Sequence, residues 1–198
     1  MTKTILGPDN RPRCRWCAAA PEFFAYHDAE WGFPVGEDIR LFEKLCLESF
    51  QSGLSWRTIL AKRENFRAAF HGFDFNRVAL FTDADVQRLL GDAGIIRHRG
   101  KIEGTIASAR AYLKIETEQG FSPFLWSFVG GAPVQTRRAS MAEVPTETEE
   151  SRAMAKALKA RGFKFCGPTI TYAFMQAVGM VNDHMVHCPA HAECAAMA

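Results

Sequence analysis

Two cysteine–histidine pairs lie near opposite ends of this 198-residue chain. Cys14 and His27 form the first pair, and His184 and Cys188 form the second. The second pair is spaced i, i+4, which on a helix would place both side chains on one face, about 5–6 Å apart. Two thiols and two imidazoles are a typical ligand set for a tetrahedral cation. If both pairs bind one metal ion, the two ends of the chain must meet in the fold.

Other cysteines and histidines offer alternative ligands. Cys17 forms a C-x-x-C motif with Cys14, so by spacing alone it competes with His27. Further donors near the second pair are His187, His191 and Cys194. The chain begins without the apolar segment of a secretory signal, so its six cysteines are expected to be reduced, as in a cytoplasmic protein. They are expected to serve as ligands or small core residues and not as disulfides.

Hydrophobic patterning predicts a helical protein. Apolar residues recur with a period near 3.6, and period-2 alternation is scarce. The pattern predicts helices over residues 37–50, 55–70, 148–161 and 168–181. Thr82 followed by Asp85 resembles a capping box at the start of another helix.

The same composition limits the domain organisation. With 47% hydrophobic residues, a chain of this length can bury one substantial core. No run of 18 apolar residues is present, so no membrane partner is expected. We predict an all-α fold in which residues 1–13 form a disordered tail and residues 14–198 form a single domain.

A glutamate falls where a core residue is expected. Glu48 lies on the same helical stripe as two leucines of its segment. A carboxylate facing the interior must be paired, protonated or reserved for a ligand. Tyr26, Trp31 and Trp56 supply aromatic surface nearby in the sequence, which would suit a flat ring that is cationic or donates hydrogen bonds. A surface glutamate at a helix end, beside aromatic core residues, fits the same pattern.

A glycine-bearing segment lies between two amphipathic helical patterns. Residues 91–101 contain three glycines and a basic cluster. Two helices joined in this way can direct unpaired backbone N–H groups at a DNA phosphate. Arg97, Arg99 and Lys101 would add positive charge there. An ordinary loop between two helices has the same appearance, and the net charge of +2 decides nothing.

Five segments in register resemble the bacterial type I (Tag) family of 3-methyladenine DNA glycosylases. They are Cys14–Trp16, Tyr26–Gly32, Leu47–Trp56, Gly94–Lys101 and Val181–His184. The resemblance covers residues 13–188 and implies a helix-hairpin-helix DNA glycosylase fold, with the hairpin part at about residues 80–120. It also implies a structural zinc ion that joins the N- and C-terminal segments. Its ligands would be Cys14, His27, His184 and Cys188.

The resemblance also assigns roles by position. The base-binding carboxylate would be Glu48, with Tyr26 beside it. The aromatic residues around the base would be Trp16, Trp31 and Trp56. Leu54 would be a wedge that enters the vacated base stack. The DNA contacts of the hairpin would be Gly94, Arg97, Arg99, Gly100 and Lys101.

The implied activity is the removal of 3-methyladenine from alkylated double-stranded DNA. Alkylation leaves a formal positive charge on the base, so the base departs without protonation by a strong acid. The enzyme would flip the nucleotide, which costs roughly a few kcal/mol, and Glu48 would accept hydrogen bonds from the N–H edge of the base. No aspartate occurs in residues 102–122, and no lysine stands out in the matched pocket segments. We therefore expect a monomeric, monofunctional glycosylase of the bacterial cytoplasm, without lyase activity.

Two other functions fit the same residues. A zinc-stabilised helical module would bind DNA without catalysis, and the release of free base would distinguish it from an enzyme. A glycosylase of broader specificity would also accept other alkylpurines. Competition with DNA that contains 7-methylguanine would reveal this breadth.

Overall fold

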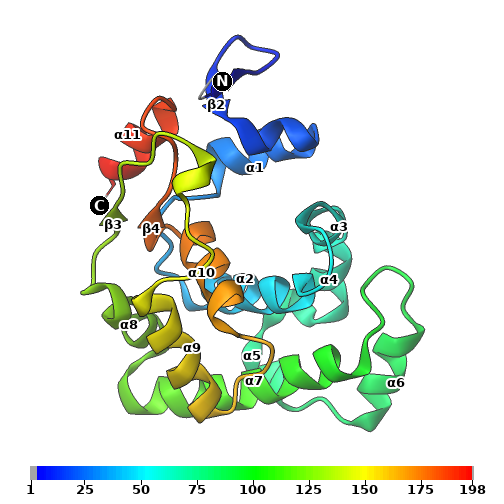
Figure 1. Ribbon diagram of the computed structural model, residues 1–198. Helices are drawn as coiled ribbons and strands as arrows, with labels where there is room; N and C mark the ends of the chain where they lie inside the picture. The colour runs from blue at the N-terminus through cyan, green and yellow to red at the C-terminus, as the bar shows by residue number, and fades with distance from the viewer. Residues whose placement is uncertain (1–3, 198) are drawn as a thin grey trace.

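The computed structural model describes residues 4–197, and helices dominate it (Figure 1). The α-helices are α1 (Glu22–Ala29), α2 (Asp38–Gln51), α3 (Trp56–Ala61), α4 (Arg63–Ala69), α5 (Phe75–Ala79), α6 (Asp83–Gly91), α7 (Arg99–Gln119), α8 (Phe121–Trp126), α9 (Glu149–Arg161), α10 (Pro168–Ala177) and α11 (Pro189–Ala195). The 3-10 helices are η1 (Arg15–Ala19), η2 (His71–Phe73), η3 (Ser127–Val129) and η4 (Met141–Glu143). Within residues 4–197, none of these helices is both long and apolar enough to cross a membrane.

Two small sheets accompany the helices, so the helix-rich prediction holds but the fold is not purely α. Strands β1 (Thr4–Leu6) and β2 (Pro12–Cys14) pair in antiparallel orientation. Strands β3 (Val134–Gln135) and β4 (Val181–Asn182) pair in parallel. Each sheet has only two strands. The first lies near the N-terminus, and the second pairs the segment before α9 with the segment before α11 (Figure 1).

The N-terminal segment differs from the expected disordered tail. From Thr4 onward it forms the β1–β2 hairpin; residues 1–3 lie outside the described part of the chain. Arg13, which is 4% exposed, explains the order. Its guanidinium donates to Asp9 within the hairpin and to Asp28 at the end of α1, with shortest distances of 2.6 Å. The sequence alone did not reveal this ion-pair network of three residues.

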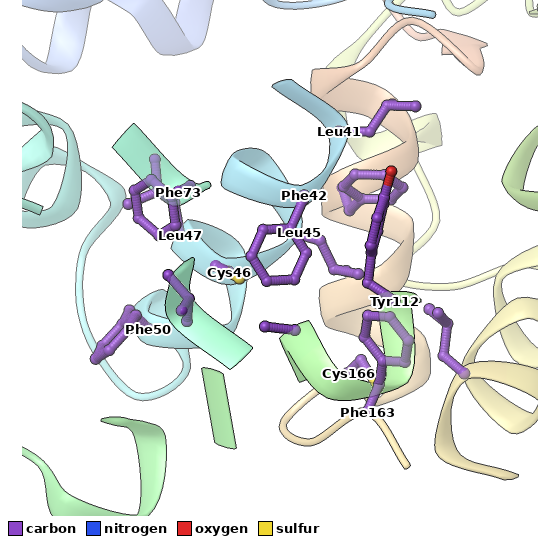
Figure 2. Close-up of a cluster of buried hydrophobic side chains, with 14 of the residues drawn as sticks. Leu41, Phe42, Leu45, Cys46, Leu47, Phe50, Phe73, Tyr112, Phe163 and Cys166 are labelled. Atoms are coloured by element: carbon purple, nitrogen blue, oxygen red, sulfur yellow. The ribbon is translucent and has the colours of Figure 1, made fainter. Parts of the chain in front are cut away.

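Helix α2 is the central element of the core. Leu41, Phe42 and Leu45 lie on its buried face, and Figure 2 shows them among side chains from distant segments such as Phe73 and Tyr112. The helix packs against α3, α7, α8 and α10. Burial of this stripe fixes the rotation of α2, and thereby the direction of the residues near its C-terminal end.

Two predicted helices end earlier than expected. The stretch predicted as one helix over residues 55–70 is divided into α3 and α4 at Lys62, whose backbone is not helical (φ −100°, ψ 2°). Helix α10 stops at Ala177 and does not reach residue 181. The chain turns at Gly179 with φ +73°, where a Cβ atom would lie 2.4 Å from the backbone of Phe33. A glycine is therefore required at this crossing.

Helices α6 and α7 pack against each other and are joined by a short loop at residues 92–98. The predicted capping box of Thr82 and Asp85 is present at the start of α6. Lys62 holds the loop, because its Nζ donates to the carbonyl oxygens of Ala93 and Gly94 at 3.0 Å. A helix–loop–helix unit is thus present over Asp83–Gln119.

The two ends of the chain meet, as the cysteine–histidine pairs predict. Helix α11 contacts both β2 and β4, and Figure 1 shows it beside the N-terminal hairpin. Arg11 and Glu193 form an ion pair at 2.7 Å across this junction.

Candidate active site

A cavity of about 300 Å³ lies between α1, α2, α3 and α10. Its walls include all five residues predicted to surround the base: Trp16, Tyr26, Trp31, Glu48 and Trp56. The remaining lining residues are Phe23, Gln51, Met141, Val144, Ala173 and Gln176. Residues from both ends of the sequence and from its middle therefore converge on one aromatic cavity.

Local structure explains how the aromatic residues converge. Trp16 lies in η1, Tyr26 in α1 and Trp31 just after α1, so one short stretch of chain carries three of the aromatic lining residues. The ring of Trp16 meets those of Tyr26 and Trp31 edge-on, with centroids 6.2 and 5.2 Å apart. Trp56 begins α3 directly after Ser55, whose hydroxyl caps the helix by accepting from Thr58 N–H. The centroids of Trp56 and Tyr26 are 5.5 Å apart.

Glu48 provides the only acidic side chain among the residues that line this cavity. It is 4% exposed, and within residues 4–197 it has no hydrogen-bond or ion-pair partner. Burial raises the pKa of Glu48 from 4.5 to about 7, against the opposing field of Lys44. The interpretation of Glu48 as a buried carboxylate is therefore confirmed, and the surface alternative is wrong.

Two indole groups in the cavity also lack partners. The Nε1 atoms of Trp16 and Trp56 are buried without a hydrogen bond in the described chain. Buried N–H groups of this kind are normally satisfied by protein, water or ligand. The cavity itself presents one strong acceptor, the carboxylate of Glu48, to any flat molecule placed between its aromatic walls.

Lys44 is a residue that the sequence analysis missed. Its Nζ donates to the Tyr26 hydroxyl at 3.1 Å and lies 4.6 and 4.7 Å from the ring centroids of Tyr26 and Trp56. Burial lowers the pKa of Lys44 to about 8, although neighbouring carboxylates oppose this. Lys44 lies outside the matched pocket segments and does not line the cavity, and its i, i+4 spacing from Glu48 was the available signal for its position.

Gln176 is a second residue whose position was not predicted. Its Nε2 donates to Asp183 at 2.8 Å, and Asp183 is fully buried. Asp183 also accepts from the Tyr172 hydroxyl at 2.5 Å and the Thr136 hydroxyl at 2.8 Å. Because a carboxylate only accepts, it fixes the orientation of the amide of Gln176. The amide oxygen of Gln176 remains for a molecule in the cavity.

The two cysteine–histidine pairs form one buried cluster. One ligand atom from each of Cys14, His27, His184 and Cys188 lies within 4.8 Å of the others. Cys14 Sγ is 3.6 Å from His184 Nδ1, and Cys188 Sγ is 3.5 Å from His27 Nε2. The helical geometry expected for the second pair is wrong, because residues 184–188 form turns between β4 and α11 and Cys188 has an extended backbone.

The surroundings of the cluster fit a bound metal ion. His27 Nδ1 bonds to the carboxylate of Asp28 at 2.8 Å, and His184 Nε2 donates to the carbonyl oxygen of Trp31 at 2.8 Å. These bonds turn the other ring nitrogen of each histidine toward the two sulfurs, as outer-shell partners do in metal sites. Gly32 leaves room for this arrangement, because a Cβ atom there would lie 2.6 Å from His184 Nε2.

The thiols of the cluster are strongly perturbed. A hydrogen bond from Cys14 and contact with both imidazoles lower the pKa of Cys188, and interaction with Cys188 raises the pKa of Cys14. The cluster therefore favours a thiolate at one position before any cation is considered. In the described residues, the competing donors are not part of it. Cys17 instead donates its thiol to the Cys14 carbonyl oxygen at 2.9 Å.

The predicted DNA contacts of the hairpin are only partly available. Arg97 and Arg99 are exposed, although Arg99 also pairs with Glu103 at 3.2 Å. The N–H group of Gly94 is used within the loop, where it donates to Asp92 at 2.7 Å. Gly100 lies in the first turn of α7, where backbone N–H groups lack helical partners.

Lys101 departs from the expected role. It is buried, and its Nζ donates to the carbonyl oxygens of Phe50 at 2.8 Å and Ser52 at 2.5 Å. A cation is favoured at the C-terminal end of a helix, here α2, because the last carbonyl groups are unpaired there. Lys101 thus joins α7 to the turn that carries Leu54. Leu54 itself is 39% exposed, as a wedge requires.

The chain is similar to known proteins over most of its length. The family model described as methyladenine glycosylase matches residues 16–191. DNA-3-methyladenine glycosylase 1 of Escherichia coli (strain K12) is 55% identical over 177 residues, which cover 89% of this chain and 95% of the relative. A crystal structure of 3-methyladenine DNA glycosylase I superimposes with a TM-score of 0.88 at 54% identity, covering 90% of this chain and 99% of the other. A single-residue variant crystallised in complex with 3-methyladenine gives a TM-score of 0.85 at 38% identity, covering 87% and 93%.

Proposed function

The chain belongs to the methyladenine glycosylase family, and we propose that it is a DNA repair enzyme that releases 3-methyladenine from alkylated double-stranded DNA. One observation carries this proposal. Glu48 is a buried carboxylate without a hydrogen-bond partner in the described chain, inside a cavity walled by aromatic rings. Such a site complements a flat, positively charged base whose edge donates hydrogen bonds.

The chemistry follows from the charge on the base. When the bond between the deoxyribose C1′ and the base nitrogen breaks, its electron pair moves to the base, which becomes neutral. The positive charge then develops on the sugar, water adds to C1′ and a proton is released. Glu48 accepts hydrogen bonds from the amino edge of the flipped base, and Trp31 and Trp56 stack against it. The amide oxygen of Gln176 and the hydroxyl of Tyr26 complete the polar contacts.

The same arrangement argues for a monofunctional enzyme that leaves an abasic site. Lyase activity needs an unprotonated amine that reaches the sugar. The ammonium of Lys44 is bound to the Tyr26 hydroxyl, and Lys44 is not one of the residues that line the cavity. We therefore expect no covalent amine intermediate with DNA.

DNA contacts would come from the loop between α6 and α7 and from the turn that carries Leu54. Helices α6 and α7 with their loop would serve as the helix-hairpin-helix unit, with Arg97, Arg99 and the first-turn N–H groups of α7 meeting phosphates. Leu54 would fill the gap left by the flipped nucleotide. We propose that the enzyme acts as a monomer in the bacterial cytoplasm.

Zinc is the metal that the four buried donors suit best. Four protein ligands complete its tetrahedral coordination and leave no position for an activated water, so its contribution is structural. The chain's own residues do the positioning. His27 is next to Tyr26 in α1, and His184 holds the backbone of Trp31. The cluster therefore fixes one wall of the cavity opposite Glu48.

The test is the release of free base from methylated duplex DNA. Wild-type protein should release 3-methyladenine, and Glu48→Gln should lower kcat/KM by at least about 100-fold while the metal content is unchanged. Glu37→Gln, at an exposed carboxylate, is the matched control and should retain activity.

Two alternatives are separated by the same assay. A DNA-binding module without catalysis would bind the duplex and release no base. Equal release of 7-methylguanine would indicate a glycosylase of broader specificity. Normal excision by Glu48→Gln would remove Glu48 from the mechanism.

A further inference from the structure

The geometry around Lys44 separates its charge from the binding surface of Glu48. The two residues are one turn apart on α2, where i, i+4 side chains are neighbours. They form no ion pair within 4.0 Å in the described chain, because the Lys44 ammonium is bound to the Tyr26 hydroxyl instead. The carboxylate oxygens of Glu48 thus remain open to the cavity.

The ammonium also lies against the aromatic wall from outside the cavity. Lys44 Nζ is 4.6 Å from the centroid of Tyr26 and 4.7 Å from that of Trp56, and both rings line the cavity while Lys44 does not. Hydrogen bonding and cation–π attraction therefore hold the cation at a fixed place. A cation placed this way acts on Glu48 through its field and consumes none of the acceptors of that carboxylate.

We propose that Lys44 is a positioning residue that keeps Glu48 ionised and ready to accept hydrogen bonds. A buried carboxyl without a nearby cation favours its protonated form, which cannot accept on both oxygens. The field of Lys44 opposes this tendency. The inference rests on the proposed function only where it concerns excision of the base. The effect on the ionisation of Glu48 stands on the geometry of α2 and its neighbours.

Other charged groups surround the pair and must be considered. Tyr26 of α1 and Glu30, which follows α1, act on Lys44 from one side. The other groups are Glu43 and Glu48 of α2 and Arg63 of α4. Glu30 is paired with Arg63 at 3.0 Å or less, and Glu43 with Arg67 at 2.8 Å. These paired charges largely offset one another. Lys101, at the C-terminal end of the same helix, is directed to backbone carbonyl groups. Among these groups, Lys44 and Glu48 are therefore the cation and the carboxylate that have no ion-pair partner in the described part of the chain.

The experiment compares wild-type protein with Lys44→Met and Lys44→Arg in the full chain with its metal. The ¹³C chemical shift of the Glu48 side-chain carboxyl, assigned by its loss in Glu48→Gln, reports ionisation without reference to activity. In Lys44→Met the titration midpoint should rise by about one pH unit or more, because the field that favours the carboxylate is gone. Lys44→Arg keeps the charge and should keep the wild-type midpoint.

Excision supplies a second measurement. The acid limb of kcat/KM should move to higher pH in Lys44→Met by the same amount as the carboxyl titration, and loss of activity at pH 6.5 should be largely recovered at pH 8.5. A titration midpoint in Lys44→Met that coincides with wild type would overturn the inference. Absence of excision by wild-type protein would instead contradict the proposed function, and the carboxyl titration would still decide the role of Lys44.

Discussion

At the scale of single residues, Glu48 is held in the core at a cost in free energy. An unfolded chain would solvate this carboxylate, whereas the folded chain surrounds it with Trp56, Tyr26 and the buried stripe of α2. The raised pKa of Glu48 expresses this cost. Buried carboxyl groups with a raised pKa are typical of functional sites.

The cost predicts how stability depends on pH. The pKa of Glu48 is about 4.5 in the unfolded chain and about 7 in the folded protein, so the folded state binds more protons between these values. The destabilisation of the fold by the buried Glu48 carboxylate is absent below pH 4.5. It grows as the pH rises to 7 and is complete above pH 7. Glu48→Gln removes it and should raise the free energy of unfolding at pH 8 by about 3 kcal/mol at most. Urea titrations at pH 4.5 and pH 8 measure the difference.

Glu37→Gln again serves as the control, because Glu37 is 69% exposed on its side chain. It should change stability by less than about 0.5 kcal/mol at either pH. Equal stabilisation by Glu48→Gln at both pH values would show that the carboxylate is not penalised in the folded state.

At the scale of elements, helix starts were the most predictable part of the fold. The capping residues of α3, α6 and α9 lie within three residues of the groups that they satisfy, so a local pattern reveals them. The i, i+4 spacing of His184 and Cys188 misled for the opposite reason. A sulfur 170 residues away and the chain turn before α11 determine that geometry, and neither leaves a periodic signal.

The role of Lys101 illustrates the same limit. Its sequence neighbours place it in a basic cluster, and the sequence therefore predicted a phosphate contact. Its partners, the carbonyl groups of Phe50 and Ser52, are 51 and 49 residues away. Burial of the ammonium at the end of α2 depends on how α7 packs there, which hydrophobic periodicity does not specify.

The helix–loop–helix unit allows a prediction about Arg97. This residue is exposed at the hairpin and has no ion-pair partner within the described chain. Arg97→Ala should weaken binding to duplex DNA and reduce the slope of log K against log salt by about one, as expected for one lost phosphate contact. Fluorescence anisotropy with a duplex that contains a tetrahydrofuran abasic analogue measures both.

Arg40→Ala is a suitable comparison, because Arg40 lies at the opposite end of α2 from the Leu54 turn. Its salt slope should match that of wild type. An unchanged slope in Arg97→Ala would place the phosphate contacts elsewhere on the protein.

At the scale of the whole molecule, the cluster of Cys14, His27, His184 and Cys188 links the two ends of the chain. Cys14→Ser should abolish stoichiometric zinc binding and lower the melting temperature, because ligand loss removes the link between β2 and the segment before α11. Cys17→Ser should retain about one zinc ion per chain, since a serine hydroxyl can still donate to the Cys14 carbonyl oxygen. Metal analysis by mass spectrometry and thermal unfolding measure the two effects. Zinc retention by Cys14→Ser would contradict the ligand set.

The convergence of the aromatic walls was predictable only through resemblance to a family. Composition and spacing indicated a cavity near Glu48, but they could not place Trp16 against Trp31 or bring Gln176 to the same space. Those contacts depend on the closure of the chain ends and on the packing of α10 against α2. The candidate site residues could thus be identified from the sequence, whereas their convergence on one cavity depends on the fold.

The separation of 170 residues between Cys14 and His184 has a consequence for the order of events during synthesis. At about 5–20 residues per second, Cys14 is added to the chain roughly 10–30 s before His184. Throughout that interval, His27 in α1 and the nearby Trp31 lack their contacts with Cys188 and His184. A nascent chain can therefore pack α2 against α3, α7 and α8 before α10 is made, yet the aromatic cavity is complete only after α10 and the segment that follows it have been translated.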